Sequence, residues 1–187
     1  MNNQNPTKVV TGTVRLSYAS IFEPKSINGG AAKYGACLII PKTDIKTVDA
    51  ISKATDAAIE AGGGKWGGKK PPRAALRLPL RDGDELHPDE EEFKNSYFMN
   101  ANNSRKPGVV DLNCNPILDR TQVYSGCYVR ASLNFFAYSN SGNKGISAGL
   151  NNIQLVREGE PLGGRSNPKD DFSDGFSTED GGDDFLS

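Results

Sequence analysis

Residues 127–138, CYVRASLNFFAY, carry the side chains of this sequence that are best suited to binding chemistry. Successive side chains of a strand point to opposite faces of a sheet, and one face here is wholly apolar. The other face combines aromatic, cationic and hydrogen-bonding groups: Tyr128, Arg130, Ser132, Asn134, Phe136 and Tyr138. Exposed aromatic rings stack nucleic-acid bases without reading sequence, and arginine meets phosphate or stacks on a base. The pattern predicts that Tyr128, Arg130, Phe136 and Tyr138 contact a nucleic acid. The alternative is that Phe136 and Tyr138 pack beneath a helix or loop.

A second candidate is the basic segment between Lys65 and Arg81, which contains no acidic residue. Trp66, the only tryptophan of the chain, lies in it among several glycines. We expect a flexible arm over a nucleic-acid backbone, with Trp66 available to stack. The alternative is a solvated loop that pairs with the acidic residues of 82–92. The expected DNA contacts are Lys65, Trp66, Lys69, Lys70, Arg73 and Arg77, together with Arg105 and Lys106 beside the aromatic pair Tyr97 and Phe98.

The C-terminal end is acidic and contrasts with the rest of the chain. Residues 170–187 hold seven acids, three phenylalanines and no Lys or Arg, whereas residues 1–169 hold 22 basic and 16 acidic side chains, a net charge of +6. Such a tail cannot bury enough apolar surface to offset its ordering entropy, so we expect a folded domain at 1–165 and a disordered tail at 166–187. The tail is expected to compete with a polyanion for the basic body and to dock on a protein partner. Its expected partner-binding residues are Phe172, Phe176, Asp183, Asp184 and Phe185.

Signals of catalysis are weak in this sequence. His87 is the only histidine, which leaves little material for a metal site or a catalytic triad. The acidic residues of 82–92 have the oxygen ligands that Mg²⁺ prefers, but such a run is more often a solvated loop. Gly62–Lys65 follows a predicted helix, whereas a phosphate-binding loop precedes one. We therefore expect no enzymatic activity, no metal and no cofactor.

Composition narrows the setting of the protein. The sequence has no apolar run long enough to cross a membrane, and its first residues lack the apolar centre of a signal peptide. Its three cysteines form no CxxC pair, which argues against a disulfide framework or a structural zinc and fits a reducing cytoplasm.

The elements that must position these residues are mostly strands. Strand patterns cover residues 8–18, 34–40, 97–101, 108–112, 126–139 and 145–156, with loops at 22–32 and 62–92. Apolar spacing predicts one clear helix from Asp44 to Ala61. Ser141–Lys144 predicts a hairpin turn, and a change of apolar parity predicts a bulge near Asn151. The fold class expected is mainly β, an OB-fold-like β-barrel with one helix inserted after the second strand and long loops, and a β-sandwich is the alternative.

Several strings of the sequence resemble a known family. NFFAYSNSG at 134–142 and GNKGISAGLNNIQLVREGEPLGGR at 142–165 are similar to the C-terminal part of a family of bacteriophage proteins. KYGACLIIPKTD at 33–44, KWGGKK at 65–70 and DGDE at 82–85 resemble it too. That family, long described only as a domain of unknown function, is associated with single-stranded-DNA binding on an OB-fold. The acidic tail is similar in kind to tails of single-stranded-DNA-binding proteins that recruit replication partners and compete with DNA. Those tails usually end on an aromatic, whereas here Leu186 and Ser187 follow Phe185.

The resemblance implies a phage-encoded, sequence-independent single-stranded-DNA-binding protein. It would coat DNA in replication, recombination or repair, in the cytoplasm of the host bacterium. The partners implied are single-stranded DNA and, through the tail, replication or recombination proteins; homo-oligomerisation is left open, and no membrane is involved. Two rival functions remain: a virion structural or assembly protein on a β-sandwich, and a metal-dependent nuclease accessory that uses the acids of 82–92.

Overall fold

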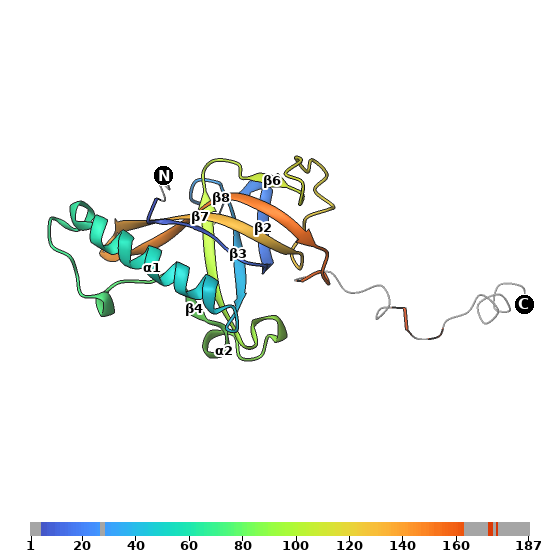
Figure 1. Ribbon diagram of the computed structural model, residues 1–187, viewed down its shortest axis with the longest axis horizontal. Coiled ribbons are helices and arrows are strands. Elements are labelled where there is room, and N and C mark those ends of the chain that lie inside the picture. The colour runs from blue at the N-terminus through green and yellow to red at the C-terminus, as the bar shows by residue number, and fades with distance from the viewer. Residues whose placement is uncertain (1–4, 27–28, 163–171, 174, 176–187) are drawn as a thin grey trace, which may run out of the picture.

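The computed structural model describes residues 5–26, 29–162, 172–173 and 175. Its helices are α1 (Ile45–Ala61) and the single turn α2 (Gly83–Leu86), with 3₁₀ turns at Gly63–Trp66, Arg73–Ala75 and Glu91–Phe93. Its strands are β1 (Lys8–Val10), β2 (Val14–Lys25), β3 (Lys33–Pro41), β4 (Arg81–Asp82), β5 (Ser96–Asn103), β6 (Gly108–Val110), β7 (Tyr128–Asn140) and β8 (Asn143–Arg157). Figure 1 shows α1 outside the sheet, beside the long strands β7 and β8.

Five of the strands close into a barrel. The ring runs β2–β3–β5–β8–β7 and returns from β7 to β2, and every neighbouring pair is antiparallel except β5–β8, which is parallel. Counted along the chain as five barrel strands, this is the order 1-2-3-5-4 around the ring. β1 extends the sheet on β7, and β6 pairs with β8. The expected mainly β, OB-fold-like barrel is therefore confirmed, with α1 following its second strand.

The inner faces of the strands form the core. Leu16, Leu38, Met99, Leu133 and Leu150, one from each barrel strand, have no solvent exposure. The apolar side of α1 joins the same core through Ile51, Ala54 and Ala58. Asp44 caps this helix, because its side chain accepts a hydrogen bond from Thr47 N. The helix predicted over 44–61 is confirmed.

A smaller apolar cluster lies on the outer face of the barrel. It joins Cys37 and Ile39 of β3 to Phe98 of β5, and Phe93 covers them. Burial raises the pKa of the Cys37 thiol to about 12, so this cysteine is an inert, protonated packing group. The segment that carries Phe93, between α2 and β5, therefore covers one end of an outer face that is otherwise open.

The strand predicted over 8–18 is two strands, and the predicted loop from Phe22 is in part strand. β1 pairs with β7 up to Val10 and Ser132, and β2 begins again at Val14 opposite Val129. Between them the chain turns toward the helix, where Gly12 N donates to Thr47 Oγ1 at 2.9 Å. Strand propensity cannot detect this break, because its cause is a partner that lies 35 residues away in the sequence.

The features predicted for the β7–β8 hairpin are confirmed. Ser141 and Gly142 form the turn with φ of 49° and 83°, the signs that a two-residue hairpin turn requires. The pairing then shifts between Ser132 and Leu133, which face Asn152 and Leu150, so that Asn151 is the extra residue of a bulge. In the part of the chain that the structure describes, no helix has the length and apolarity needed to cross a bilayer.

Candidate nucleic-acid interface

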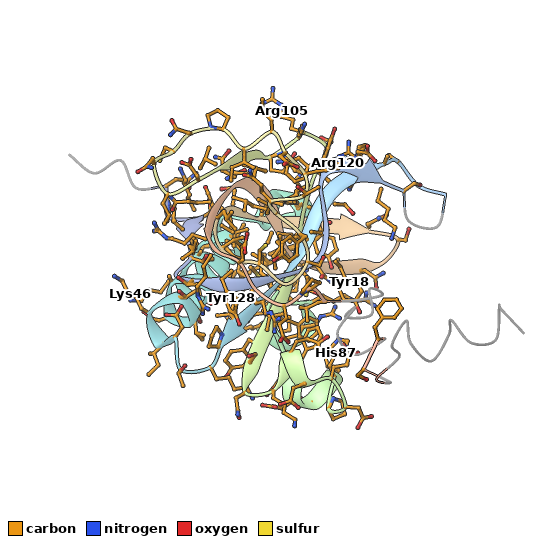
Figure 2. The ribbon with its side chains drawn as sticks, turned by 90° about the vertical axis from the view of Figure 1, so that its right-hand side faces the viewer. Tyr18, Lys46, His87, Arg105, Arg120 and Tyr128 are labelled. Atoms are coloured by element: carbon orange, nitrogen blue, oxygen red, sulfur yellow. The ribbon has the colours of Figure 1, made fainter. Side chains whose placement is uncertain are left out.

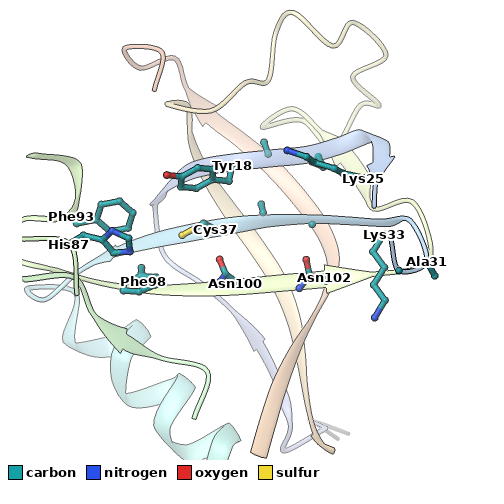
Figure 3. A pocket seen from close by; sticks show the side chains of 15 residues that line it. Tyr18, Lys25, Ala31, Lys33, Cys37, His87, Phe93, Phe98, Asn100 and Asn102 are labelled. Carbon is teal, nitrogen blue, oxygen red and sulfur yellow. The ribbon is translucent and has the colours of Figure 1, made fainter. Parts of the chain in front are cut away.

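A groove of about 800 Å³ crosses the outer face of β2, β3 and β5. Figure 3 shows its three regions: the rings of His87, Phe93 and Phe98 at one end, Lys25 and Lys33 at the other, and Tyr18 between them. Asn100 and Asn102 of β5 face the same space. Among the residues that the structure describes, those that line the groove include no aspartate or glutamate. An aromatic, amide-lined and cationic groove is suited to a flexible anion with flat rings.

Tyr18 is the exposed ring of this groove, with 67% of its surface accessible. It sits in β2 with a φ of 45°, between the paired residues Ser17 and Ser20, where the β2–β3 register shifts. A bulge of this kind re-aims a side chain, and here it turns outward a tyrosine that strand alternation from Leu16 would place in the core. Ala19 N donates to Ser125 Oγ at 3.0 Å, which ties the bulge to the body of the protein.

At Gly35 of β3 the floor of the groove is formed by a neighbouring side chain, that of Asn102. A Cβ on Gly35 would lie 2.1 Å from Asn102 Oδ1 and 2.8 Å from Ala101 O, so the position has no room for a side chain. The amide of Asn102 lies across this position and supplies both a donor and an acceptor. A flat group in the middle of the groove would therefore rest on the amide of Asn102.

The wall at the aromatic end is built from three rings in contact. The ring of His87 stacks on Phe93 with centroids 4.2 Å apart and an interplanar angle of 18°, and Phe98 meets both rings edge-on. His87 Nδ1 also lies 3.1 Å from Glu90 Oε1. These contacts fix His87, the one histidine, as a wall of the groove.

The cations at the other end of the groove come from two places in the chain: the ends of the connection between β2 and β3, and the segment that follows β5. Lys33 begins β3 beside Tyr34, which pairs with Asn103 at the end of β5. Arg105 and Lys106, both exposed, follow directly after that strand. Lys106 Nζ lies 6.0 Å from the ring of Phe22 on β2. Arg105 and Lys106, which were predicted to contact DNA, thus lie at the same end of the sheet as Lys25 and Lys33. Lys25 and Lys33 were not predicted from the sequence.

The prediction that Trp66 is free to stack is wrong. Trp66 is only 5% exposed, and its Nε1 donates to Tyr138 O at 3.0 Å. Its ring packs against Gly62, where a Cβ would approach Trp66 Cη2 to 2.9 Å. The indole is part of the core because the glycines at the end of α1 let the chain turn its ring inward.

The basic segment that surrounds Trp66 is held against α1. Lys70 forms an ion pair with Glu60, and Arg73 forms one with Asp56, both acids being on the helix. Lys65 and Lys69 are exposed. Both interpretations of the segment therefore need correction: it is tied to the helix rather than being a free arm, and these pairs do not involve the acids of 82–92.

Two of those acids pair with a different lysine. Lys42 Nζ lies 2.9 Å from Asp82 and 2.8 Å from Asp84, and the hydrogen bonds from Lys42 lower the pKa of both carboxyl groups. Asp82 also accepts from Asp84 N at 2.9 Å, which starts the turn α2. Among the described residues, no cluster of three or more His, Cys, Asp or Glu side chains could hold a metal ion.

The two faces of β7 have the parity that was predicted. Cys127, Val129, Ala131, Leu133, Phe135 and Ala137 are all buried. On the outer face, the ring of Tyr128 lies between Arg157, 3.8 Å away, and Arg15, 5.5 Å away. Arg130 donates to Thr11 O and to Gln154 Oε1. Tyr128 and Arg130 are therefore held by neighbours near the start of the strand.

The far end of β7 is more open. Phe136 is 45% exposed, so the alternative that it packs beneath a helix or loop is wrong for this ring. Tyr138 is half-buried, and its hydroxyl flanks Gly145 of β8 together with Arg77, which the pairing Arg77–Gly145 brings beside the strand. Three of the predicted contacts, Arg77, Phe136 and Tyr138, thus come together on one surface, away from Tyr128 and Arg130.

The tail predictions fall almost wholly outside the described residues. Phe176, Asp183, Asp184 and Phe185 lie there, and Phe172, which is described, is 80% exposed. Leu162, which ends the main described range, packs on the cluster of Cys37, Phe93 and Phe98, and its N donates to Ser125 O at 2.8 Å. The chain therefore leaves the barrel beside the aromatic end of the groove.

Tyr18, Lys25, Lys33, Asn100 and Asn102 are the groove residues that the sequence analysis missed. For Tyr18 the sequence contains one signal: the apolar residues Leu16 and Ile21 are five positions apart, an odd spacing that breaks strand alternation if both face the core, as they do in the structure. For the other four residues the groove appears only when β2, β3 and β5 are placed side by side.

Comparison with known proteins found a matching family model and a similar phage protein. A family model described as the ssDNA-binding protein of Enterobacter phage Enc34 matches residues 7–186. Protein p50 of Acyrthosiphon pisum secondary endosymbiont phage 1 is 34% identical over 166 residues, which are 84% of this chain and 87% of that protein.

Two solved structures share the fold. The single-stranded DNA-binding protein from bacteriophage Enc34, in complex with ssDNA, has a TM-score of 0.75 and 24% identity, and the match covers 85% of this chain and 91% of that one. Gp2.5, a single-stranded DNA binding protein encoded by bacteriophage T7, has a TM-score of 0.60 and 18% identity, over 91% and 95% of the two chains. At these identities the likeness concerns the fold.

Proposed function

The chain belongs to the family of the Enterobacter phage Enc34 ssDNA-binding protein, and on that premise we propose that it binds single-stranded DNA in the groove on β2, β3 and β5. The observation that carries the proposal is the composition of the groove: an exposed tyrosine, two asparagines and two lysines, with no carboxylate among the described residues that line it. The second and third strands of an OB barrel, here β3 and β5, form the face on which such barrels bind oligonucleotides.

Each group has a role that follows from its chemistry. Tyr18 stacks a base, and every base offers a ring face, so this contact does not depend on sequence. Lys25 and Lys33 meet phosphates, and Arg105 and Lys106 extend that contact beyond the end of β5. Asn100 and Asn102 donate to and accept from base edges, and their amides can rotate to suit different bases.

The role that follows is to coat single-stranded DNA during phage replication, recombination or repair, in the cytoplasm of the host bacterium. A strand that lies in this groove is held and protected without a chemical step, so we propose a binding protein rather than an enzyme. The rival functions in virion assembly and as a nuclease accessory are not favoured, because the family match extends over nearly the whole chain.

The acidic tail, residues 166–187, is proposed to compete with DNA for this groove and to dock on replication or recombination proteins. Leu162, four residues before this segment in the sequence, packs at the aromatic end of the groove. A short flexible tether can raise the effective concentration of such a segment to about millimolar. Truncation after Lys169 should therefore leave folding intact and tighten binding to oligo-dT, most strongly at low salt because exposed charges are screened over about 8–10 Å. Unchanged binding at low salt would contradict this mechanism.

The main experiment is a titration of labelled oligo-dT, followed by fluorescence anisotropy across a salt series. We expect a dissociation constant of about 1 μM or lower and a log–log slope of about −0.7 for each phosphate contact. A protein that binds the oligonucleotide without any dependence on salt, or does not bind it at all, would refute the proposal.

A further inference from the structure

The outer face of the barrel continues past the groove, across β8, to the far end of β7. The register defines a row of residues across the strands: Gly35 faces Asn102, Asn102 faces Gly149, and Gly149 faces Asn134. Phe136, two residues further along β7, has its side chain on the same face as Asn134. The row begins at the Tyr18 bulge on β2, because Gly35 also faces Ser20.

This row has no side chain of its own at two positions, and both are covered by neighbouring side chains. Gly35 is buried, and the amide of Asn102 covers its backbone. Gly149 is also buried, and a Cβ placed there would meet Phe136 Cε1 at 3.6 Å and Asn134 O at 3.5 Å, which are ordinary contacts. The edge of the Phe136 ring therefore borders Gly149, with no other side chain between it and Asn102 in this row.

Beyond the floor lies a surface with the composition of a nucleic-acid contact, here named the β7 platform and made of Phe136, Tyr138 and Arg77. Phe136 is 45% exposed on the outer face of a strand whose inner face supplies the core. A Cβ on Gly145 would lie 2.9 Å from both Tyr138 Oη and Arg77 Cβ, which places the hydroxyl and the arginine side by side. Arg77 forms no salt bridge with any residue that the structure describes, so its guanidinium is available to a phosphate.

We propose that the β7 platform is a second base-stacking site for the strand that occupies the groove, reached over the floor of Gly35, Asn102 and Gly149. The proposal rests on the proposed function of the groove. From β2 to β7 the row crosses four strand intervals of about 4.8 Å, about 19 Å in all. Single OB folds engage about 4–16 nucleotides, so a short oligonucleotide would fill the groove and only a longer one would reach Phe136.

The test compares two lengths of labelled oligo-dT, of about four and about twelve nucleotides. Phe136→Ala should weaken binding of the longer oligonucleotide by roughly 5- to 150-fold, the range for loss of one base stack, and leave the shorter one unchanged. Tyr18→Ala should weaken both lengths. Val10→Ala is the matched control, an exposed apolar residue on the same sheet that faces Ser132 rather than the platform.

A second series tests the floor without removing an aromatic ring. Gly149→Leu should weaken the longer oligonucleotide selectively because its side chain would stand between Asn102 and Phe136. Gly149→Ala, whose Cβ makes ordinary contacts, should have a smaller effect in the same direction. Thermal melting identifies any variant that has lost its fold.

The outcomes separate the two proposals. A Phe136→Ala protein that binds the longer oligonucleotide like the wild type, or that loses the shorter one as well, would overturn the second site and leave the groove intact. A wild-type protein that binds both lengths with equal affinity would also overturn it. A wild-type protein that binds neither length would instead remove the proposed function.

Discussion

The groove and the basic segment at 65–81 both contain lysines and an aromatic ring, but they differ in what holds their charges. In the basic segment, Lys70 and Arg73 are paired with acids of α1. In the groove, Lys25 and Lys33 form no salt bridge with any described residue. A cation that already has a carboxylate partner must lose it before it can bind phosphate, so the density of cations in a sequence says less than their partners do.

The aromatic rings of the two regions differ in the same way. Trp66 donates its N–H to Tyr138 O and is buried, whereas Tyr18 is 67% exposed at a bulge. The larger ring stabilises the fold, and the smaller one is available to a ligand. Aromatic side chains serve both purposes, and it is the backbone on either side that decides which.

The largest effect expected from this comparison is on stability. Trp66→Ala should lower the free energy of unfolding by about 3–5 kcal/mol, because it removes a large buried side chain and leaves a cavity. Chemical denaturation followed by circular dichroism measures the change. Lys65→Ala, an exposed neighbour, is the control and should change stability by no more than about 0.5 kcal/mol. A folded Trp66→Ala protein with native stability but weakened DNA binding would reverse the roles given to the two rings.

The next effect is on binding. Tyr18→Ala should weaken oligo-dT binding by about 1–3 kcal/mol, the value of one base–aromatic stack, and leave the melting temperature nearly unchanged. Ile45→Ala is a matched control, because Ile45 is 74% exposed on α1. Figure 2 shows its neighbour Lys46 on the side of the molecule away from Tyr18. If Tyr18→Ala binds as tightly as the wild type, the groove is not the site.

A smaller effect separates the cations of the two regions. Lys25→Ala and Lys33→Ala should each reduce the steepness of the log–log salt dependence of oligo-dT binding by about 0.7, the value of one phosphate contact on a single strand. Lys70→Ala and Arg73→Ala remove the same charge from the paired region and should change the slope less. The four variants change the net charge by the same amount. A difference in slope between the two groove variants and the two variants of the basic segment therefore reports direct contact with phosphate. Equal slopes in all four would mean that the paired segment contacts DNA as closely as the groove does.

The sequence was informative where local pattern controls structure. Alternation along β7 identified its buried face, helical spacing identified α1, and the parity change at Asn151 located a bulge. Sequence patterns did not predict the structure where a contact with a residue far away in the chain determines it. Gly12 donates to Thr47, the buried Trp66 donates to Tyr138 O, and Lys70 pairs with Glu60. The groove combines three strands that are separated by up to about 80 residues in the chain, so no window of the sequence contains it.

The smallest expected effect concerns two acidic residues of the segment 82–92, Asp82 and Asp84. Asp82 and Asp84 both pair with Lys42, and Asp82 caps the start of α2. His87, whose ring is part of the aromatic wall of the groove, follows directly after α2. The hydrogen bonds from Lys42 lower the pKa of both carboxyl groups from the usual 3.8. Their contribution to stability is therefore complete above pH 3.8 and is lost as the pH falls through the lower, folded-state pKa values.

Lys42→Met should make the protein less sensitive to acid in that range, because without the lysine the two carboxyl groups lose the main cause of their shifts. The measurement is the free energy of unfolding between about pH 6 and pH 2 for the wild type, Lys42→Met and Lys46→Met. Lys46 is exposed and forms no salt bridge with any described residue, so Lys46→Met removes the same charge and should keep the wild-type pH dependence. Equal acid sensitivity in all three proteins would show that the Lys42 pair is too exposed to stabilise α2. The position of His87 would then depend on its contacts with Phe93, Phe98 and Glu90, and the aromatic wall of the groove would be independent of the Lys42 ion pairs.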